Sequence, residues 1–271
     1  MVSRRQHMLY AMKKPEHLSR SFMSHHPSPQ NTSQKKRVLL KLSGELLSNT
    51  KMLSHIVAQI STLKAKIDFA FVVGGGNVLR GRETPYACVP RAEVDTIGMC
   101  ASVLNSLLFK AALTENALKA KVFTPFTMQN LSSILSNDAL YTCTSDGVMP
   151  IFAGGTGHPF VSTDTAAVLY ALRFSCDRIL KGTRVNGLFD KDPETHKDAK
   201  LLPHITHEDA LAKPCALLDS AAIALARDHA LPLTIFNVNR EKGLELALCS
   251  VQPLTQVVCS KHNTEQQRGQ S

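Results

Sequence analysis

Apolar residues in this chain alternate between short continuous runs, typical of buried strands, and stripes with helical spacing. The first run covers 37–43 and the next covers 67–73, and each ends at a glycine. Between them, apolar residues recur every three or four positions, which predicts a helix over 52–64. The residues of this stripe are Leu53, Ile56, Val57, Ile60 and Leu63.

The same alternation of strand and helix continues to the end of the chain. A long helix is predicted over 95–116, starting at Asp95, and shorter helices over 165–174 and 218–229. The residues of the long helix that are expected to face the core are Ile97, Ala101, Leu104, Leu108, Ala111 and Ala112. Further strands are predicted at 121–124, 150–153, 177–181, 233–237 and 255–259, the last of them at an edge.

Strands that alternate with helices predict an α/β fold: a three-layer sandwich with a mostly parallel central sheet and helices on both faces. Ligands of such sheets gather at the carboxyl ends of the strands. The chain has 271 residues, of which 44% are apolar, enough for one sizeable core or two joined lobes.

Charge is concentrated in residues 1–36, which carry seven basic residues and one acidic residue out of a net charge of +9. This segment has no sustained periodicity, and we expect a disordered, solvated basic tail rather than a nucleic-acid-binding arm. Its Arg- and Ser-rich composition also leaves organelle targeting open. The polar residues 260–271 are expected to form a loose C-terminal tail.

Cysteine spacing and the length of the apolar runs indicate the compartment. The seven cysteines are scattered without a C-x-x-C pair, which fits a reducing environment and argues against a structural zinc site. No apolar run approaches the roughly 18 residues that span a bilayer, so we expect a soluble, cytoplasmic protein without membrane contact.

Two glycine clusters each follow a predicted strand. The first is Gly74-Gly75-Gly76-Asn77, and the second is Gly154-Gly155-Thr156-Gly157. Glycine lets backbone N–H groups approach an anion closely. Two such turns at the same edge of a sheet predict two anionic groups held near one another, which is the geometry that phosphoryl transfer requires.

Charged residues near these clusters are candidates for the same chemistry, each with a plain structural alternative. Lys41 lies in an apolar strand, where an ammonium is costly without an anionic partner, unless it faces water at an edge. Arg80 follows the first cluster and suits bidentate phosphate contact, or it is a surface residue. Asp95, Asp164 and Asp219 stand at predicted helix starts, where N-capping and ligand binding are compatible.

Other familiar sites are excluded by their motifs. The chain has no G-x-x-x-x-G-K-[ST] sequence, and Phe160 stands where a dinucleotide fingerprint needs its third glycine. His204 and His207 are three residues apart but have no third candidate ligand, so no protein-held metal site is expected.

Taken together, the segments Lys41-Leu42-Ser43-Gly44-Glu45, Val73-Gly74-Gly75-Gly76-Asn77-Val78-Leu79-Arg80-Gly81 and 154–164 resemble the amino acid kinase superfamily, and most closely its bacterial-type uridylate kinases. Supporting segments at 94–99, 180–193 and 219–229 follow in the family's order, so the resemblance covers about 36–259.

The resemblance implies an amino acid kinase-like fold over 37–259, with an acceptor half over about 37–160 and an ATP half over about 161–259. It implies transfer of a phosphoryl group from ATP to UMP, in pyrimidine nucleotide synthesis, by a cytoplasmic homohexamer. The catalytic residues that it implies are Lys41, Arg80, Asp164 and Asp219. The ATP-binding residues are Lys41, Leu42, Ser43, Gly44, Gly76, Arg80, Thr183, Phe189 and Asp192. The UMP-binding residues are Gly75, Asp95, Thr156, Gly157, His158, Pro159, Phe160, Val161, Ser162 and Thr163.

The implied chemistry needs charge neutralisation and alignment rather than a general base, because the acceptor is already an anion. Mg²⁺ is expected to be carried by ATP and water. His158 stands where relatives usually have asparagine, and we expect an effect on UMP affinity. Two alternatives stay open: another kinase of the superfamily, and a non-catalytic nucleotide- or oxyanion-binding protein on the same fold.

Overall fold

The computed structural model describes residues 35–78, 88–191, 193, 195–212 and 218–259. Strands in this part of the chain are β1 (Lys36–Leu42), β2 (Ile67–Val73), β3 (Ala120–Thr124), β4 (Ser133–Ile134), β5 (Met149–Phe152), β6 (Arg178–Thr183), β7 (His204–Thr206), β8 (Leu233–Asn237) and β9 (Thr255–Val258). Helices are α1 (Gly44–Leu47), α2 (Thr50–Leu63), α3 (Arg91–Glu115), α4 (Asn137–Ser145), α5 (Thr163–Arg173), α6 (His207–Ala212), α7 (Ser220–Asp228) and α8 (Gly243–Leu248).

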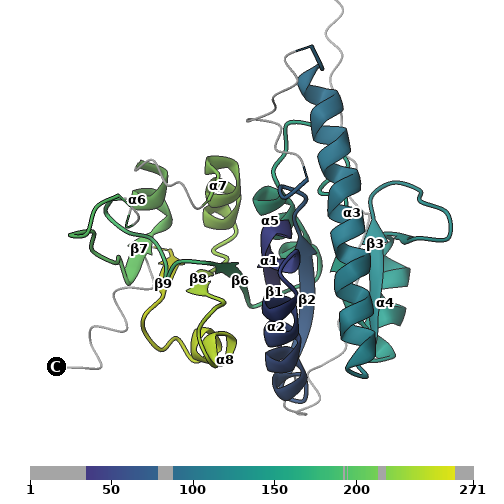
Figure 1. The fold of residues 1–271 in the computed structure, drawn as a ribbon, viewed down its shortest axis with the longest axis horizontal. Coiled ribbons are helices and arrows are strands. Elements are labelled where there is room, and N and C mark those ends of the chain that lie inside the picture. Colours follow the sequence, from purple (N-terminus) through teal and green to yellow (C-terminus); the bar gives the residue numbers. More distant parts are fainter. Residues whose placement is uncertain (1–34, 79–87, 192, 194, 213–217, 260–271) are drawn as a thin grey trace, which may run out of the picture. The chain divides into compact units, whose positions relative to one another are not determined.

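Within the described residues, the strands form one nine-stranded sheet in the order β4-β3-β5-β2-β1-β6-β8-β9-β7, which Figure 1 shows from β3 on one side to β7 on the other. All pairs are parallel except β8 with β9. The strands before residue 160 lie together on one side of the sheet, and those after it lie on the other.

Two apolar clusters cover the two faces of the sheet. One joins Val38, Leu40 and Leu42 of β1 to helices α1, α2, α3 and α8, and the other joins Leu39 of the same strand to α4, α5, α6 and α7. Alternate residues of β1 therefore face opposite helical layers, as the period of a strand requires. The three-layer α/β sandwich expected from the sequence is confirmed.

Helix α3 begins earlier and faces the sheet differently than predicted. It begins at Arg91, with Pro90 at the N-cap, so Asp95 lies inside the helix and does not cap it. Of the six residues expected in the core only Ala101 is fully buried, whereas Leu104 is 63% exposed. The residues that are buried are Val94, Ala101, Ser102, Val103, Asn105, Ser106, Phe109 and Leu113. The prediction was wrong because it took apolar side chains as the mark of the inner face, which here includes hydrogen-bonded polar ones.

Other elements differ from the predictions at their ends and at the last strand. Helix α2 begins at Thr50, two residues before its predicted start, because the Asn49 side chain caps it by accepting from the Met52 N–H. The predicted terminal edge strand is β9, which is not at an edge, because the short strand β7 pairs with its outer side. Sequence periodicity could not reveal β7, since it has three residues.

Helix α3 also corrects the expectation that no segment could span a membrane. By length and composition alone, this helix of 25 residues is apolar enough to cross a bilayer. In this fold it packs on the sheet through Phe109 and Leu113, and its small polar residues bond to neighbouring loops. Those contacts are the ones that a core helix makes.

Candidate functional site

The carboxyl ends of β1, β2 and β5 bring three loops together. Gly44 begins the short helix after β1, and a Cβ there would overlap the side chains of Asn77 and Asn105 and lie 2.7 Å from the Gly74 carbonyl oxygen. Only a residue without a side chain allows this approach. The glycine that the sequence placed after Lys41-Leu42-Ser43 is therefore required where the first two loops meet.

Two lysines and one aspartate form the charged centre of this edge. Lys41 of β1 and Lys181 of β6 are direct partners in the parallel ladder, so their side chains leave the same face of the sheet. The Asp164 carboxylate lies between them, with its two oxygens 2.7 Å from Lys41 Nζ and 2.5 Å from Lys181 Nζ. The three side chains are 10 to 14% exposed. They carry one net positive charge beside the start of α5.

Burial and the mutual charges of this triad shift the pKa values of two of its members. Burial alone raises the pKa of Asp164, but the ammonium groups of Lys41 and Lys181 outweigh it and lower the pKa to about 2. Burial lowers the pKa of Lys181 to about 8, and the charge of Lys41 adds to this effect against the attraction of Asp164. Asp164 is therefore firmly ionised at neutral pH, while Lys181 holds its proton only weakly.

Lys181 is a site residue that the sequence reasoning missed. It follows the apolar pair Ile179-Leu180 in a strand that is buried from Ile179 onward, so the argument about a costly buried ammonium applies to Lys181 as it does to Lys41. The signal was present, and it becomes specific only when the register of β1 and β6 is known.

Helix α5 begins at this centre, and its first turn is tied to α7. Ser162 caps α5 by accepting from the N–H groups of Asp164 and Thr165, and its hydroxyl donates to Asp219. Asp219 also accepts from the Thr165 hydroxyl at 3.1 Å and caps α7 at the Ala222 N–H. The Asp219 carboxylate thus orients the N-terminus of α5, and its negative charge also acts to raise the pKa of Lys181.

A cavity of about 240 Å³ opens between the first glycine cluster, α3 and the loop before α5. Predicted site residues that line it are Gly75, Gly76, Asp95, His158, Val161, Ser162 and Thr163. Lining residues that were not predicted are Val94, Gly98, Met99, Ser102 and Gly155. The other predicted residues of this loop, Thr156, Gly157, Pro159 and Phe160, lie beside the cavity without lining it.

Asp95 fixes this loop to α3. One carboxylate oxygen accepts from the Phe160 N–H at 2.8 Å, and the other accepts from Arg91 Nε at 2.8 Å. Phe160 has a φ of +67°, which is unfavourable for a residue with a side chain, and its ring is largely exposed. The His158 ring lies over its own loop, with Nδ1 3.1 Å from the Thr156 carbonyl oxygen.

The residues predicted for ATP are spread over the ends of β1 and β6. The Leu42 side chain is fully buried in the core, and its carbonyl accepts from the Gly74 N–H. Ser43 is half-buried at the N-cap of α1. The Thr183 hydroxyl donates to the Val185 carbonyl at 2.6 Å, and half-buried Phe189 pairs with Leu201 in an isolated bridge. Arg80 and Asp192 lie outside the described residues.

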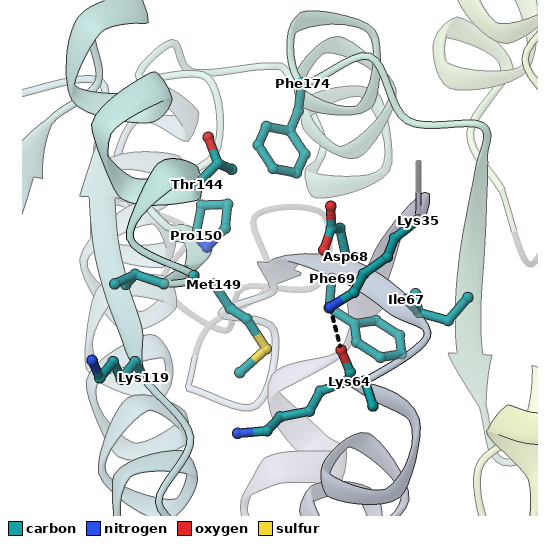
Figure 2. Close-up of a pocket in the computed structure, with 13 residues that line it drawn as sticks. Lys35, Lys64, Ile67, Asp68, Phe69, Lys119, Thr144, Met149, Pro150 and Phe174 are labelled. Atoms are coloured by element: carbon teal, nitrogen blue, oxygen red, sulfur yellow. Dashed lines mark hydrogen bonds between the residues drawn. The ribbon is translucent and has the colours of Figure 1, made fainter. Parts of the chain in front are cut away.

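A second cavity of about 240 Å³ lies at the opposite, amino-terminal edge of the sheet, where Figure 2 shows its lining residues. The C-terminal ends of α2, α4 and α5 lie beside it: Lys64 and Phe174 are the C-cap residues of α2 and α5, and Thr144 is in the last turn of α4. Lys35 Nζ donates to the Lys64 carbonyl oxygen at 3.4 Å, a hydrogen bond that is drawn as a dashed line in Figure 2. Lysines at helix C-termini offset the negative end of the helix dipole, so this positive charge has a structural explanation. The candidate site is the cavity at the carboxyl edge.

The described residues contain no group of three or more His, Cys, Asp or Glu side chains that could hold a metal ion. The Asp164 carboxylate is occupied by two ammonium groups. A divalent cation at this edge would therefore rely on oxygens supplied by its own ligand.

Fold and site together define a class of protein: an α/β protein in which one edge of the sheet brings together glycine turns, two buried lysines and a helix N-terminus. The sequence profile described as the amino acid kinase family matches residues 36–237. The chain therefore belongs to the amino acid kinase family, in the branch that holds the uridylate kinases.

Individual relatives agree with this assignment. The uridylate kinase of Campylobacter concisus is 38% identical over 221 residues, 78% of this chain and 93% of that protein. The uridylate kinase of Wolbachia sp. subsp. Brugia malayi is 36% identical over 76% of this chain and 87% of its own. Among solved structures, the UMP kinase of Ureaplasma parvum superposes with a TM-score of 0.78 and 27% identity over 83% of this chain and 99% of its own. The resemblance predicted from the motifs is confirmed.

Proposed function

We propose that this chain is a nucleoside monophosphate kinase that transfers the γ-phosphoryl group of ATP to UMP. The observation that carries the proposal is the Lys41–Asp164–Lys181 triad, whose Asp164 directly follows Ser162 and Thr163 of the lining of a glycine-rich cavity. The names of the relatives, uridylate kinase and UMP kinase, supply the acceptor. A bond forms between a phosphate oxygen of UMP and the γ-phosphorus, the bond from that phosphorus to the β–γ bridging oxygen breaks, and ADP leaves.

In this proposal the two lysines neutralise the charge that develops on the transferred group, and Asp164 holds them side by side. The proposed ATP-binding residues are Lys41 to Gly44, Gly76 and Arg80 for the phosphates, and Thr183, Phe189 and Asp192 for the nucleoside. Gly75, Asp95 and the loop 156–163 hold UMP. Asp219 acts by orienting the first turn of α5. Mg²⁺ enters on the phosphates of ATP, and no protein base is needed because the UMP phosphate is already an anion.

We further propose that the working form is a cytoplasmic homohexamer. Ile97, Leu104 and Leu108 form an exposed apolar row along α3, 46 to 63% exposed in the single chain, which self-association would cover. Free thiols among the described cysteines fit a reducing compartment. Light scattering of the purified chain should give the mass of an oligomer, and Leu104→Glu should reduce it; a wild-type monomer at micromolar concentration would contradict this.

The low pKa of Lys181 predicts a pH dependence of ATP capture. Above about pH 8 the free protein loses this positive charge, so kcat/KM for ATP should fall. Bound polyphosphate favours the charged ammonium, so kcat itself should fall only at higher pH. Initial rates between pH 7 and pH 9.5 give the pH dependence of kcat/KM for ATP and of kcat. A value of kcat/KM that stays constant through this range would contradict the role of Lys181 in ATP binding.

The proposed function is tested by offering MgATP with UMP, CMP, dTMP or N-acetylglutamate separately to the purified chain. UDP formation well above product from the other acceptors is the expected result. Faster phosphorylation of N-acetylglutamate than of UMP would identify the chain as another kinase of the superfamily. ATP binding without turnover of any acceptor would identify it as a non-catalytic binding protein.

A further inference from the structure

The face of α3 that is turned toward the site carries buried polar residues. Ser102 is 1% exposed, and its hydroxyl has two backbone partners. It donates to the Val73 carbonyl oxygen at 2.6 Å and accepts from the Gly154 N–H at 3.1 Å. Three residues further along α3, Asn105 donates to the Gly74 carbonyl at 2.8 Å. The hydrogen bonds of α3 therefore end on the loops of the site.

One partner of Ser102 directly precedes the first glycine cluster, and the other is the first residue of the second cluster. Val73 is the last residue of β2 and precedes Gly74, while Gly154 opens the second cluster. Strands β2 and β5 are paired only as far as Val72 and Phe152. The next bond of this ladder would join the two strands just beyond that pair. In its place, the Ser102 hydroxyl bonds to both segments, to the Val73 carbonyl oxygen and to the Gly154 N–H.

The first cluster also rests directly on the backbone of α3. A Cβ at Gly75 would overlap the Gly98 carbonyl oxygen and lie 2.8 Å from the Ser102 nitrogen. The second cluster has an independent anchor, because the Tyr170 hydroxyl donates to the Gly155 carbonyl at 2.6 Å. Loss of the Ser102 hydroxyl would leave each loop with its own support and remove the bond that joins them.

We propose that Ser102 is a positioning residue that sets the spacing between the turn facing the transferred phosphoryl group and the loop holding UMP. This inference rests on the proposed function, in which Gly76 of the first cluster serves the phosphates of ATP and the loop 156–163, directly after Gly154 and Gly155, serves UMP. Reacting atoms must lie at near-contact distance for efficient transfer, and a misplacement of about 1 Å can cost about a hundredfold in rate. The Ser102 hydroxyl donates to Val73 and accepts from Gly154, so its effect is on the alignment of the reacting atoms.

The test compares Ser102→Ala with Ser106→Ala in the full chain. Ser106 is a matched control, since it lies one turn further along α3, is equally buried, and its hydroxyl bonds only within the helix, to the Ser102 carbonyl. The measurements are kcat, separate dissociation constants for ATP and UMP, and affinity for an analogue in which adenosine and uridine are joined by a phosphate chain.

For Ser102→Ala we expect kcat and the affinity for the joined analogue to fall by about ten- to a hundredfold, with each separate dissociation constant within about threefold of wild type. Ser106→Ala should match wild type in all four. Equal behaviour of the two variants, or a loss confined to the separate dissociation constants, would overturn the role of Ser102. Wild-type protein without UMP turnover would instead reject the proposed function.

A nearly isosteric variant covers the case in which Ser102→Ala does not fold. Ser102→Cys keeps the shape of the side chain while replacing the hydroxyl by a weak donor and acceptor. The same four quantities are measured for Ser102→Cys. A fall in kcat and in affinity for the joined analogue supports the role of Ser102, and behaviour equal to that of Ser106→Ala overturns it.

Discussion

Replacement of Lys41 by methionine is expected to lower kcat for UDP formation by about a hundred- to a thousandfold. The change removes one of the two ammonium groups that flank Asp164, so the triad falls from one net positive charge to none. Removal of a single preorganised charge donor commonly costs this much, because water cannot replace it in a buried site. Steady-state rates at saturating MgATP and UMP measure the loss.

The matched control for this variant is Lys36→Met. Lys36 begins the same strand β1 but is exposed at the opposite end of the sheet. It should keep wild-type kcat. Equal activity of Lys41→Met and Lys36→Met would show that the triad is a structural ion pair without a role in transfer.

Replacement of Asp164 by asparagine is expected to lower the free energy of unfolding by about 3 kcal/mol at neutral pH. The change removes the carboxylate that lies between two buried ammonium groups, so their positive charges repel each other directly. The cost stays near the lower end for broken buried pairs because Lys181, whose pKa is already about 8, can release its proton. Urea unfolding followed by circular dichroism gives the difference.

The control is Asp198→Asn, since Asp198 is paired with Lys191 at the surface and is 71% exposed. Exposed ion pairs contribute little to the free energy of unfolding, so this control variant is expected to lose about 1 kcal/mol or less.

The difference in the free energy of unfolding between wild type and Asp164→Asn should also vanish in acid. The low pKa of Asp164 contributes stability that is complete above about pH 4 and is lost as the pH falls toward about 2. Similar urea midpoints for the two variants at pH 7 would contradict the account.

The sequence predicts those parts of the fold whose secondary structure is determined by apolar side chains alone. The predicted ends of strands β2 and β8 agree with the observed ones, because each is a mostly apolar run whose residues are largely buried. The glycine clusters were predicted as neighbours because parallel strands end at the same edge. Asp164, expected near the start of its helix, lies in the first turn of α5 and at the charged centre.

The parts that could not be read depend on partners distant in the sequence. The inner face of α3 is polar at Ser102 and Asn105 because loops from β2 and β5 satisfy them, and no local pattern reveals those loops. Lys181 became a site residue only through its register with Lys41. Asp219 was read as an N-cap or as part of the phosphate site, and the structure gives it a cap and a bond to the start of α5.

The central claim is that the triad and the adjoining cavity transfer phosphate to UMP in preference to other acceptors. The most direct measurement mixes UMP, CMP and dTMP at equal concentration with MgATP and follows the diphosphate products by mass spectrometry, for wild type and Lys41→Met. We predict UDP in large excess from the wild type and almost no product from the variant. Comparable amounts of all products, or UDP formation that survives the loss of Lys41, would contradict it.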